Sequence, residues 1–298
     1  MTNIRMMKQN DVSQVQDVGQ IAWSDMATKD AGRKITYPRR SDLLINSYLK
    51  SDPDGCIVAE DRGKIVGSAF CHKWGDIGWI GPLEVLPEYQ NKKIGKALLN
   101  ACGTYLSSCR VCGLETSPKS EKNMHFYTSF GYSVGTSILV AEKITSSEAE
   151  YRATELNSPD DFDISKLCNN VCPGLDLSSE VESALSGLGH VYFTENGFAI
   201  LHTFSRGSDI RYSSVKALII DPNCKKPSQE LFNLLSTCEA RSYDLGRNSL
   251  MMRFSLEHRE LASILPSLDY SYKAVNVRMT CKGDFSENGD YQIISWAG

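Results

Sequence analysis

The chain has 298 residues, of which 41% are hydrophobic and 23% charged, and its formal net charge at pH 7 is −4. These values are those of an ordinary folded protein, and the length favours two domains over one. The negative charge argues against general nucleic-acid binding, and no apolar run is long enough to cross a membrane. Residues 1–7 lack the hydrophobic core of a secretory signal, so a cytoplasmic protein is expected.

Ten cysteines are many for a chain of this length. Cys109 and Cys112 have the spacing of a redox motif or of half a zinc site, but the sequence offers no second such pair and no paired histidines nearby. In a reducing compartment the alternative is a set of buried free thiols. The second interpretation is preferred, and no metal site is expected.

The periodicity of the first 132 residues predicts alternating helices and strands. In chain order we expect a strand at Ile4–Met7, a helix capped by Asn10 or Asp11, a helix capped by Ser41, strands at Cys56–Glu60, Ile65–His72 and Trp79–Val85, a helix at Ile94–Leu106, a strand at Arg110–Glu115 and a helix at Asn123–Phe130. This order predicts an α/β fold in which helices flank both faces of a mixed, mostly antiparallel sheet.

The most informative stretch runs from Leu83 to Leu99, where a buried strand, a basic turn and an amphipathic helix follow one another. The N-terminus of a helix presents free N–H groups and a partial positive charge, which together favour an anion. Lys92, Lys93 and Lys96 add positive charge at this point. The stretch therefore predicts a binding site for a phosphate or pyrophosphate group.

The turn resembles the pyrophosphate loop of the GNAT N-acetyltransferase superfamily, whose pattern is Gln or Arg, two residues, Gly, one residue, then Gly or Ala. Here Gln90 and Gly95 match, and Lys93 stands where the family has its first glycine. The resemblance implies that acetyl-CoA is the cofactor. It also implies that its pyrophosphate binds the loop residues Gln90, Asn91, Lys92, Lys93, Ile94, Gly95, Lys96 and Ala97.

A second family motif, Phe or Leu followed by Tyr, three residues, Gly and an aromatic residue, is matched in full at Phe126–Tyr132. In the family this tyrosine protonates the departing CoA sulfur, which makes Tyr127 the candidate general acid. The alternative is that Tyr127 only packs its helix against the sheet. Ser120, a plausible helix cap, and Asn123 lie just before the motif and are further candidates for cofactor binding.

The strand before the loop supplies the remaining candidates. In the family, backbone groups of this strand bind the acetyl carbonyl and the pantetheine arm, and they correspond here to Leu83 and Val85. Glu84 is the only ionisable side chain on the strand. A carboxylate at this place could take the proton of an attacking amine, so Glu84 is a candidate base. Exposure to solvent, or pairing with a lysine, is the equally weighted alternative.

The polar stretch 145–150 is the best linker, and it predicts a GNAT acetyl-CoA-binding domain over 1–144 and a second domain over 150–298. The element order repeats in the second half. Leu83–Pro87 corresponds to Leu218–Pro222, and Phe126–Tyr132 corresponds to about Ile264–Tyr270. The second half therefore resembles a diverged GNAT unit.

The functional positions of that unit are changed. The loop has no glycine, Pro227 removes an amide donor, and Leu265 replaces the tyrosine. We therefore expect it to bind no cofactor, and it either walls the acceptor cleft or stabilises the first half.

The resemblance implies an N-acetyltransferase that transfers an acetyl group from acetyl-CoA directly to a primary amine of a small molecule or peptide. The acidic composition favours a cationic acceptor, with Asp25, Asp30 and Glu84 on the acceptor side in the family. The alternative is a non-catalytic protein that binds or senses acyl-CoA, with the second half as a docking surface for a partner. The sequence leaves the acceptor and the oligomeric state open.

Overall fold

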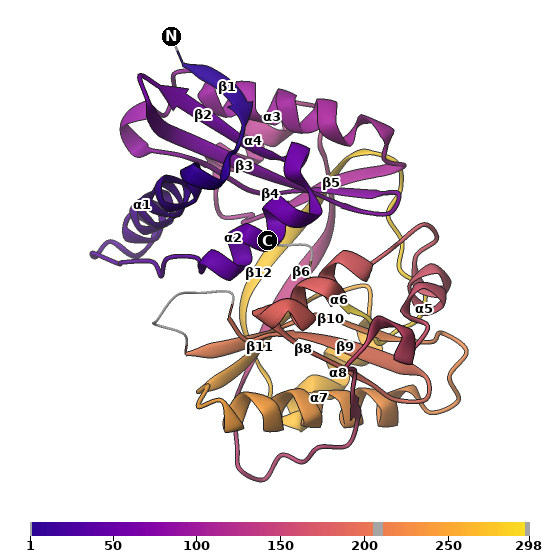
Figure 1. Ribbon diagram of the computed structural model, residues 1–298. Helices are drawn as coiled ribbons and strands as arrows, with labels where there is room; N and C mark the ends of the chain where they lie inside the picture. The colour runs from indigo at the N-terminus through magenta and orange to yellow at the C-terminus, as the bar shows by residue number, and fades with distance from the viewer. Residues whose placement is uncertain (1, 205–210, 296–298) are drawn as a thin grey trace.

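The computed structural model describes residues 2–204 and 211–295. In the first half (residues 2–144) the helices and strands are β1 (Asn3–Met6), α1 (Val12–Ala31), α2 (Asp42–Ser51), β2 (Cys56–Asp61), β3 (Lys64–Trp74), β4 (Ile77–Val85), α3 (Ile94–Tyr105), β5 (Val111–Thr116), α4 (Glu121–Thr128) and β6 (Ser133–Ile144). Helices α1 and α2 lie on one side of the strands of this half, and α3 and α4 lie on the other (Figure 1).

The second half (residues 150–295) repeats this order and adds one short strand. Its helices and strands are β7 (Thr154–Glu155), α5 (Ile164–Val171), α6 (Ser178–Ser183), β8 (Gly189–Phe193), β9 (Gly197–His202), β10 (Tyr212–Ile220), α7 (Pro227–Asp244), β11 (Ser249–Ser255), α8 (Arg259–Ile264), β12 (Ser271–Lys282) and β13 (Ile293–Ile294). The order of elements therefore matches between the halves up to β12.

Local geometry repeats as well. The Tyr132 amide donates to the Tyr127 carbonyl over 3.2 Å, and the Tyr270 amide donates to the Leu265 carbonyl over 3.1 Å. Gly131 and Asp269, which precede these two donors, both have left-handed backbones, with φ of 82° and 66°. The same turn thus ends α4 in one half and follows α8 in the other, and Leu265 takes the place of Tyr127.

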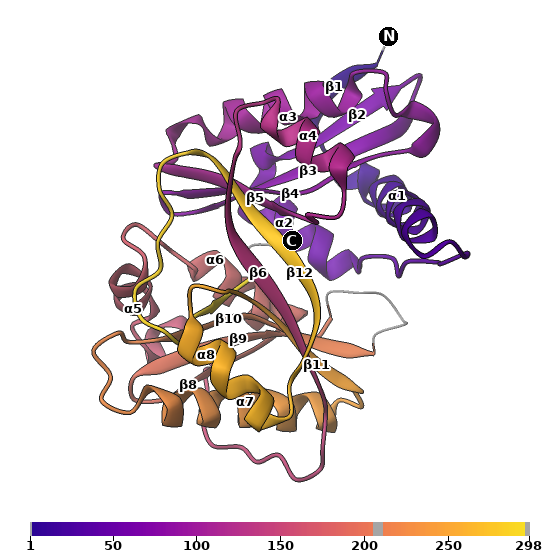
Figure 2. The ribbon, with the colours of Figure 1, turned by 180° about the vertical axis from the view of Figure 1, so that it is seen from behind.

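The two halves exchange strands at the centre of the molecule. The strands form one sheet in the order β1-β2-β3-β4-β5-β12-β6-β11-β10-β9-β8-β7, with β13 on β10. Strand β12 of the second half pairs with β5 and β6, and β6 pairs with β11 on its other side. Figures 1 and 2 show β6 and β12 side by side as the ribbon that joins the two halves.

The interior is continuous between the halves. Trp74, Ile77 and Trp79 of the first half are buried in one hydrophobic cluster with residues of α5, α6, β8, β9 and β10. Burial of such side chains contributes about 1.5–3 kcal/mol each, so this shared cluster resists separation of the halves.

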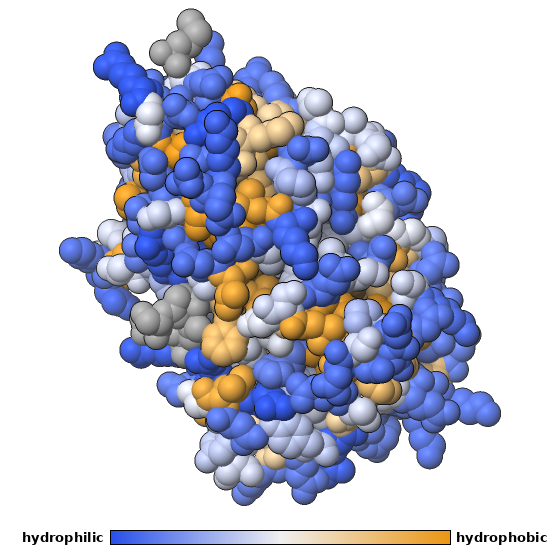
Figure 3. All heavy atoms as spheres, viewed as in Figure 1, coloured by the Kyte–Doolittle hydropathy of each residue, from blue (hydrophilic) through white to orange (hydrophobic). Residues whose placement is uncertain are grey.

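The outer surface is mostly polar. In the view of Figure 3, hydrophobic residues form separate patches among hydrophilic ones. Among residues 2–204 and 211–295, no helix has both the length and the hydrophobicity needed to cross a bilayer.

The sequence-based fold class is confirmed, since two GNAT-like units with mixed sheets and flanking helices are present. Ser41 caps α2 as expected, because its hydroxyl oxygen accepts from the Leu44 amide over 3.1 Å. The exchange of β6 and β12 was not expected. The domain boundary expected between residues 144 and 150 stays a prediction, because one continuous sheet contains strands of both halves.

Candidate active site

The site is built around the exposed edge of β4. Strand β4 pairs in parallel with β5 only from Ile77 to Ile80. Its pairing with β3 continues to Val85, after one extra residue in β4 between Ile80 and Leu83. Among the described residues, no strand pairs with the second half of β4 on the side that faces β5.

Backbone direction along β4 follows from one hydrogen bond. The Leu86 amide donates to the Val66 carbonyl, toward β3. Since backbone groups of a strand alternate in direction, those of Leu83 and Val85 point the opposite way, to the unpaired edge. The Val85 carbonyl there accepts from Gln90 Nε2 over 3.2 Å, which ties the loop to this edge.

The loop before α3 has the shape that its motif predicts. Asn91 and Lys93 have φ of 61° and 64°, so both occupy the left-handed region. Lys93 therefore takes the conformation for which the family uses glycine, and it is the N-cap of α3. The first amides of α3 have no partner within the helix, so they are available to an anion.

Lysine side chains surround this helix end. Lys92, Lys93 and Lys96 are exposed, with Lys92 Nζ 4.6 Å from the centre of the Tyr89 ring and Lys96 Nζ 5.6 Å from that of Phe130. Three positive charges beside a helix N-terminus attract a pyrophosphate.

Helix α4 closes the site on the other side. Ser120 caps it by accepting from the Asn123 amide over 3.3 Å, and the Asn123 side-chain amide lies 3.5 Å from Thr116 Oγ1 at the end of β5. Lys122 Nζ donates to Gln90 Oε1 over 2.7 Å, so α4 is held against the loop. Ser120 and Asn123 thus shape α4 and fix its position.

Tyr127 lies on α4 among other aromatic rings. Its ring centre is 5.2 Å from that of Phe126 and 5.9 Å from that of Tyr132. Burial, with a smaller contribution from Cys102, raises the pKa of Tyr127 to about 12. Among the described residues its hydroxyl makes no hydrogen bond, so the phenol keeps its proton at neutral pH and can donate it.

Glu84 is buried on the α1 side of β4 and is fully engaged. Its two oxygens accept from Arg40 over 2.6 and 3.1 Å, from Trp23 Nε1 over 2.5 Å and from the Ser68 hydroxyl over 3.3 Å. Burial by itself would lower the pKa of Arg40, but the charge and the hydrogen bonds of Glu84, with smaller contributions from Tyr48 and Tyr37, together raise it. The partner is thus an arginine in the interior, which neither sequence alternative anticipated.

Helix α1 approaches this ion pair through a glycine. A Cβ atom on Gly19 would lie 2.5 Å from a terminal nitrogen of Arg40 and 3.0 Å from Glu84 Oε2. Glycine therefore leaves room for α1 to pass over the pair, and a larger residue would require Arg40 to shift. Arg40, Trp23 and Gly19 carry no motif, and sequence reasoning did not single them out.

His72 supports the point where β4 leaves β5. Its Nε2 is 3.2 Å from the Gly81 carbonyl oxygen, and its Nδ1 is 3.4 Å from Asp52 Oδ2. Asp52 also accepts from the Tyr105 hydroxyl over 2.8 Å. These contacts fix the extra residue of β4 and so the course of its free edge.

The cysteine pair lies away from this site. Cys109 and Cys112 are buried and free, and burial raises the pKa of Cys112 to about 11. A thiol with a raised pKa forms little thiolate, which is the form that redox and metal chemistry require.

Together these groups fit the pantetheine and pyrophosphate of a coenzyme A thioester. The β4 edge offers outward-facing backbone groups, the N-terminus of α3 offers free amides and positive charge, and Tyr127 offers a protonated phenol. A Cβ atom on Gly95 would lie 3.6 Å from the ring of Phe126, so α4 packs close to the loop at this point.

A family model described as the acetyltransferase (GNAT) family matches residues 17–132. This match covers β2 to β5, α3 and α4, and so all of the groups above. A search of curated proteins returned no match.

Solved structures resemble the whole chain. A protein from Pyrococcus horikoshii provisionally named as an acetyltransferase shares 15% identity with a TM-score of 0.75, over 99% of this chain and 95% of that one. A GCN5-related N-acetyltransferase from Sphaerobacter thermophilus shares 11% identity with a TM-score of 0.64, over 97% and 98%. A tandem GNAT protein from the clavulanic acid biosynthesis pathway shares 11% identity with a TM-score of 0.59, over 97% and 99%.

At these identities the likeness of the structures establishes the fold, and the family match supports acyl transfer from an acyl-CoA to an acceptor. Residues 17–132 therefore match the acetyltransferase (GNAT) family, and the whole chain folds as two GNAT-like units in tandem.

Proposed function

We propose that the chain is an acetyl-CoA-dependent N-acetyltransferase that transfers the acetyl group directly to a primary amine of a small molecule or peptide. The observation that carries the proposal is the free edge of β4. It directs the backbone groups of Leu83 and Val85 toward a side on which no strand of the described residues pairs with β4, next to the N-terminus of α3 and to Tyr127.

Acetyl-CoA supplies a thioester whose acetyl group the amine nitrogen attacks. The backbone groups of Leu83 and Val85 hold the acetyl carbonyl and the pantetheine arm, and an amide there stabilises the carbonyl oxygen, which gains negative charge as the new C–N bond forms. One such donor is typically worth about 2.7–4 kcal/mol. The loop Gln90–Ala97 holds the pyrophosphate through backbone amides and lysine charges, and the side chain of Gln90 keeps the loop against β4.

Tyr127 donates its proton to the sulfur as the C–S bond breaks. A phenol with a pKa of about 12 is protonated at every pH at which the enzyme would work. General-acid catalysis of this kind contributes about 10²–10⁴-fold.

The role of Glu84 as a base stays a prediction, and its contacts argue for a different one. A carboxylate has about four acceptor sites, and Arg40, Trp23 and Ser68 supply four donor contacts to them. We propose that Glu84 positions Arg40 and α1 beside the β4 edge, and that the amine proton leaves through water.

The acceptor side carries less free negative charge than the sequence suggests. Asp25 accepts from Lys29 Nζ over 2.6 Å, and Glu84 is neutralised by Arg40. We therefore propose that shape and hydrogen bonding, rather than carboxylates, select the amine.

Release of free thiol from acetyl-CoA in the presence of a panel of primary amines tests the function. Tyr127→Phe should lose about 10²–10⁴-fold in kcat while binding acetyl-CoA unchanged. Tyr132→Phe is the matched control, since it removes a buried hydroxyl from the same aromatic cluster and should retain the rate. Binding without turnover for every amine would favour the alternative of an acyl-CoA sensor.

A further inference from the structure

The second half contains a counterpart of the β4 edge. Strand β10 pairs in parallel with β11 from Tyr212 to Val215, as β4 pairs with β5 from Ile77 to Ile80, 135 residues earlier. Both β4 and β10 then carry one extra residue relative to their antiparallel neighbour. The same departure of one strand from its parallel partner is therefore built into both halves.

In the second half this edge is covered by the end of the chain. Strand β13 pairs with β10 at the residues that follow the extra residue, with Ala217 opposite Ile294 and Leu218 opposite Ile293. Because β9 holds the other edge of β10, β13 lies on the edge that β11 has left. Leu218 corresponds to Leu83, one of the two residues proposed to hold the acetyl-CoA.

The side-chain amide of Gln292 also occupies this edge of β10. Gln292 Nε2 donates to the Ile220 carbonyl over 2.8 Å, and Gln292 Oε1 accepts from the Ile220 amide over 3.0 Å. Ile220 corresponds to Val85, the other proposed acetyl-CoA contact. Gln292 is 1% exposed, so one buried amide satisfies both backbone groups at this position.

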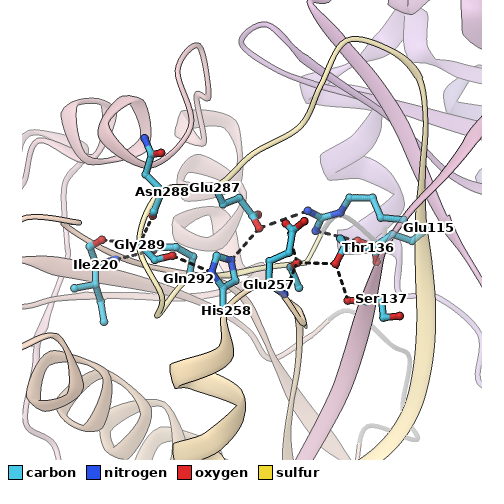
Figure 4. A network of polar contacts seen from close by, with 12 residues as sticks. Glu115, Thr136, Ser137, Ile220, Glu257, His258, Glu287, Asn288, Gly289 and Gln292 are labelled. Atoms are coloured by element: carbon cyan, nitrogen blue, oxygen red, sulfur yellow. Dashed lines mark hydrogen bonds and ion pairs between the residues drawn. The ribbon is translucent and has the colours of Figure 1, made fainter.

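Further contacts hold this segment in place. His258 Nδ1 donates to the Gly289 carbonyl over 2.9 Å (Figure 4). The Asn288 amide donates to the Val171 carbonyl over 2.7 Å. The last residue of α5 and the N-cap residue of α8 thus fix the segment.

Glu287, which comes just before these residues in the chain, is linked to the first half. Glu287 lies 3.0 Å from His258 Nε2 and 3.5 Å from Arg278 on β12, and Arg278 lies 3.4 Å from Glu115 on β5 (Figure 4). The side chains of Glu287, Arg278 and Glu115 are 2–3% exposed. Glu287, the residue just before the segment Asn288–Ser295, is thus linked through Arg278 to the first half, and residues 292–295 of the segment are buried.

We propose that the segment Asn288–Ser295 is an internal ligand of the second half. Its backbone and the Gln292 amide occupy the edge that corresponds to the acetyl-CoA edge of the first half, as the amides of a pantetheine arm would. The second half is thereby closed to cofactor, and of these two corresponding edges that of β4 remains open. The comparison with acetyl-CoA rests on the proposed function, whereas the cover of β10 does not.

Hydrogen exchange resolved to single amides tests this in the full chain. Without ligand, the Ile220 amide should be protected and the Val85 amide should exchange faster. Gln292→Ala should raise the exchange rate of the Ile220 amide about tenfold or more, because a buried partner is lost. Gln292→Met, which keeps the approximate size but lacks both the acceptor and the donor, gives the same direction if the alanine variant does not fold.

Gln229→Ala on α7 is the control, since Gln229 is exposed and its side chain bonds only to Asn233 among the described residues. Added acetyl-CoA should protect Leu83 and Val85 and leave Leu218 and Ile220 unchanged. An Ile220 amide that is unprotected, or unaffected by both Gln292 variants, would overturn the proposal, as would its further protection by acetyl-CoA. Lack of protection at Leu83 and Val85 alone would instead contradict the proposed function.

Discussion

Lys93 illustrates how one backbone angle decides the shape of a binding loop. A glycine would adopt φ of 64° at no steric cost, whereas a residue with a side chain loses about 1–2 kcal/mol in the left-handed region. The loop takes this shape all the same, and it gains a positive charge there. The motif could be recognised from sequence despite the substitution, but only the structure shows that its geometry survives.

Lys93→Gly should therefore raise the free energy of unfolding, by about 1 kcal/mol relative to Lys92→Gly. Both variants remove one positive charge from the loop, but Lys92 does not have a positive φ. Urea unfolding of the two variants measures the difference. Equal stabilities would mean that the backbone at Lys93 is not strained.

Tyr127 leads to a prediction about pH. Burial places its pKa at about 12, above the usual 10, so the acid is fully protonated up to about pH 11. Ionisation of Tyr127 should therefore not lower the rate of acetyl transfer near pH 10. The wild type and Tyr127→Phe should have the same pH dependence in that range. The pH profile of thiol release from both proteins measures this, and a fall near pH 10 in the wild type alone would contradict the assignment.

At the scale of elements, the packing of α1 over β4 depends on Gly19 and Arg40, two residues without a motif. Gly19 on α1 makes room for Arg40, and Arg40 neutralises Glu84 on β4. Sequence periodicity predicted the helix and the strand, and it identified Glu84 as notable. It could not predict the partner, because Arg40 lies in a loop whose course is set by tertiary contacts.

Two glycines in helices should respond in opposite ways to alanine. Gly19→Ala should lower the free energy of unfolding, since its Cβ would meet Arg40 at 2.5 Å. Gly103→Ala on α3 should raise it by about 0.5–1 kcal/mol, because the site is exposed and no atom is near. Thermal unfolding of both variants tests this, and a stabilised Gly19→Ala would refute the close packing.

Loss of Arg40 should destabilise the protein, because the buried carboxylate of Glu84 would lose its positively charged partner. Arg40→Met should lower the free energy of unfolding by about 3–5 kcal/mol. The double variant Arg40→Met with Glu84→Met should recover much of this, since both charges are then absent. Urea unfolding of the single and double variants provides the measurement, and a double variant no better than the single one would contradict the pairing.

At the scale of the whole molecule, the repeat of elements was predictable from sequence, and the exchange of strands was not. Periodicity indicates that residues 271–282 can form a strand, but the choice of neighbour depends on long-range packing. Strand β13 is two residues long, too short to give a periodic signal. The loss of the pyrophosphate loop was visible in the second half, whereas the segment that covers its β10 edge was not.

Contact between the halves should make stability depend on pH. Glu180 on α6 accepts from Trp74 Nε1 over 3.0 Å and lies 3.5 Å from Lys216 Nζ. Burial alone would raise the pKa of Glu180, but Lys216 and His202 lower it well below its usual 4.5. Below about pH 4.5 the unfolded chain therefore binds a proton that the folded protein does not, and stability falls as pH falls.

Glu180→Gln should reduce this acid dependence, because the titrating group is gone. Urea unfolding at pH 7, 5 and 4 compares the variant with the wild type. Glu182→Gln is the control, since Glu182 has an exposed side chain with only a distant pairing to Lys50 Nζ at 3.7 Å. An unchanged acid dependence in Glu180→Gln would mean that this carboxylate does not join the halves as described.

The central claim is that one half of the chain binds acetyl-CoA and the other does not. Calorimetric titration of the full chain with acetyl-CoA tests it most directly. We predict one equivalent per chain, with affinity weakened by Gly95→Asp, which places a carboxylate at the helix end proposed to hold the pyrophosphate. Two equivalents per chain, or no binding at all, would contradict the account.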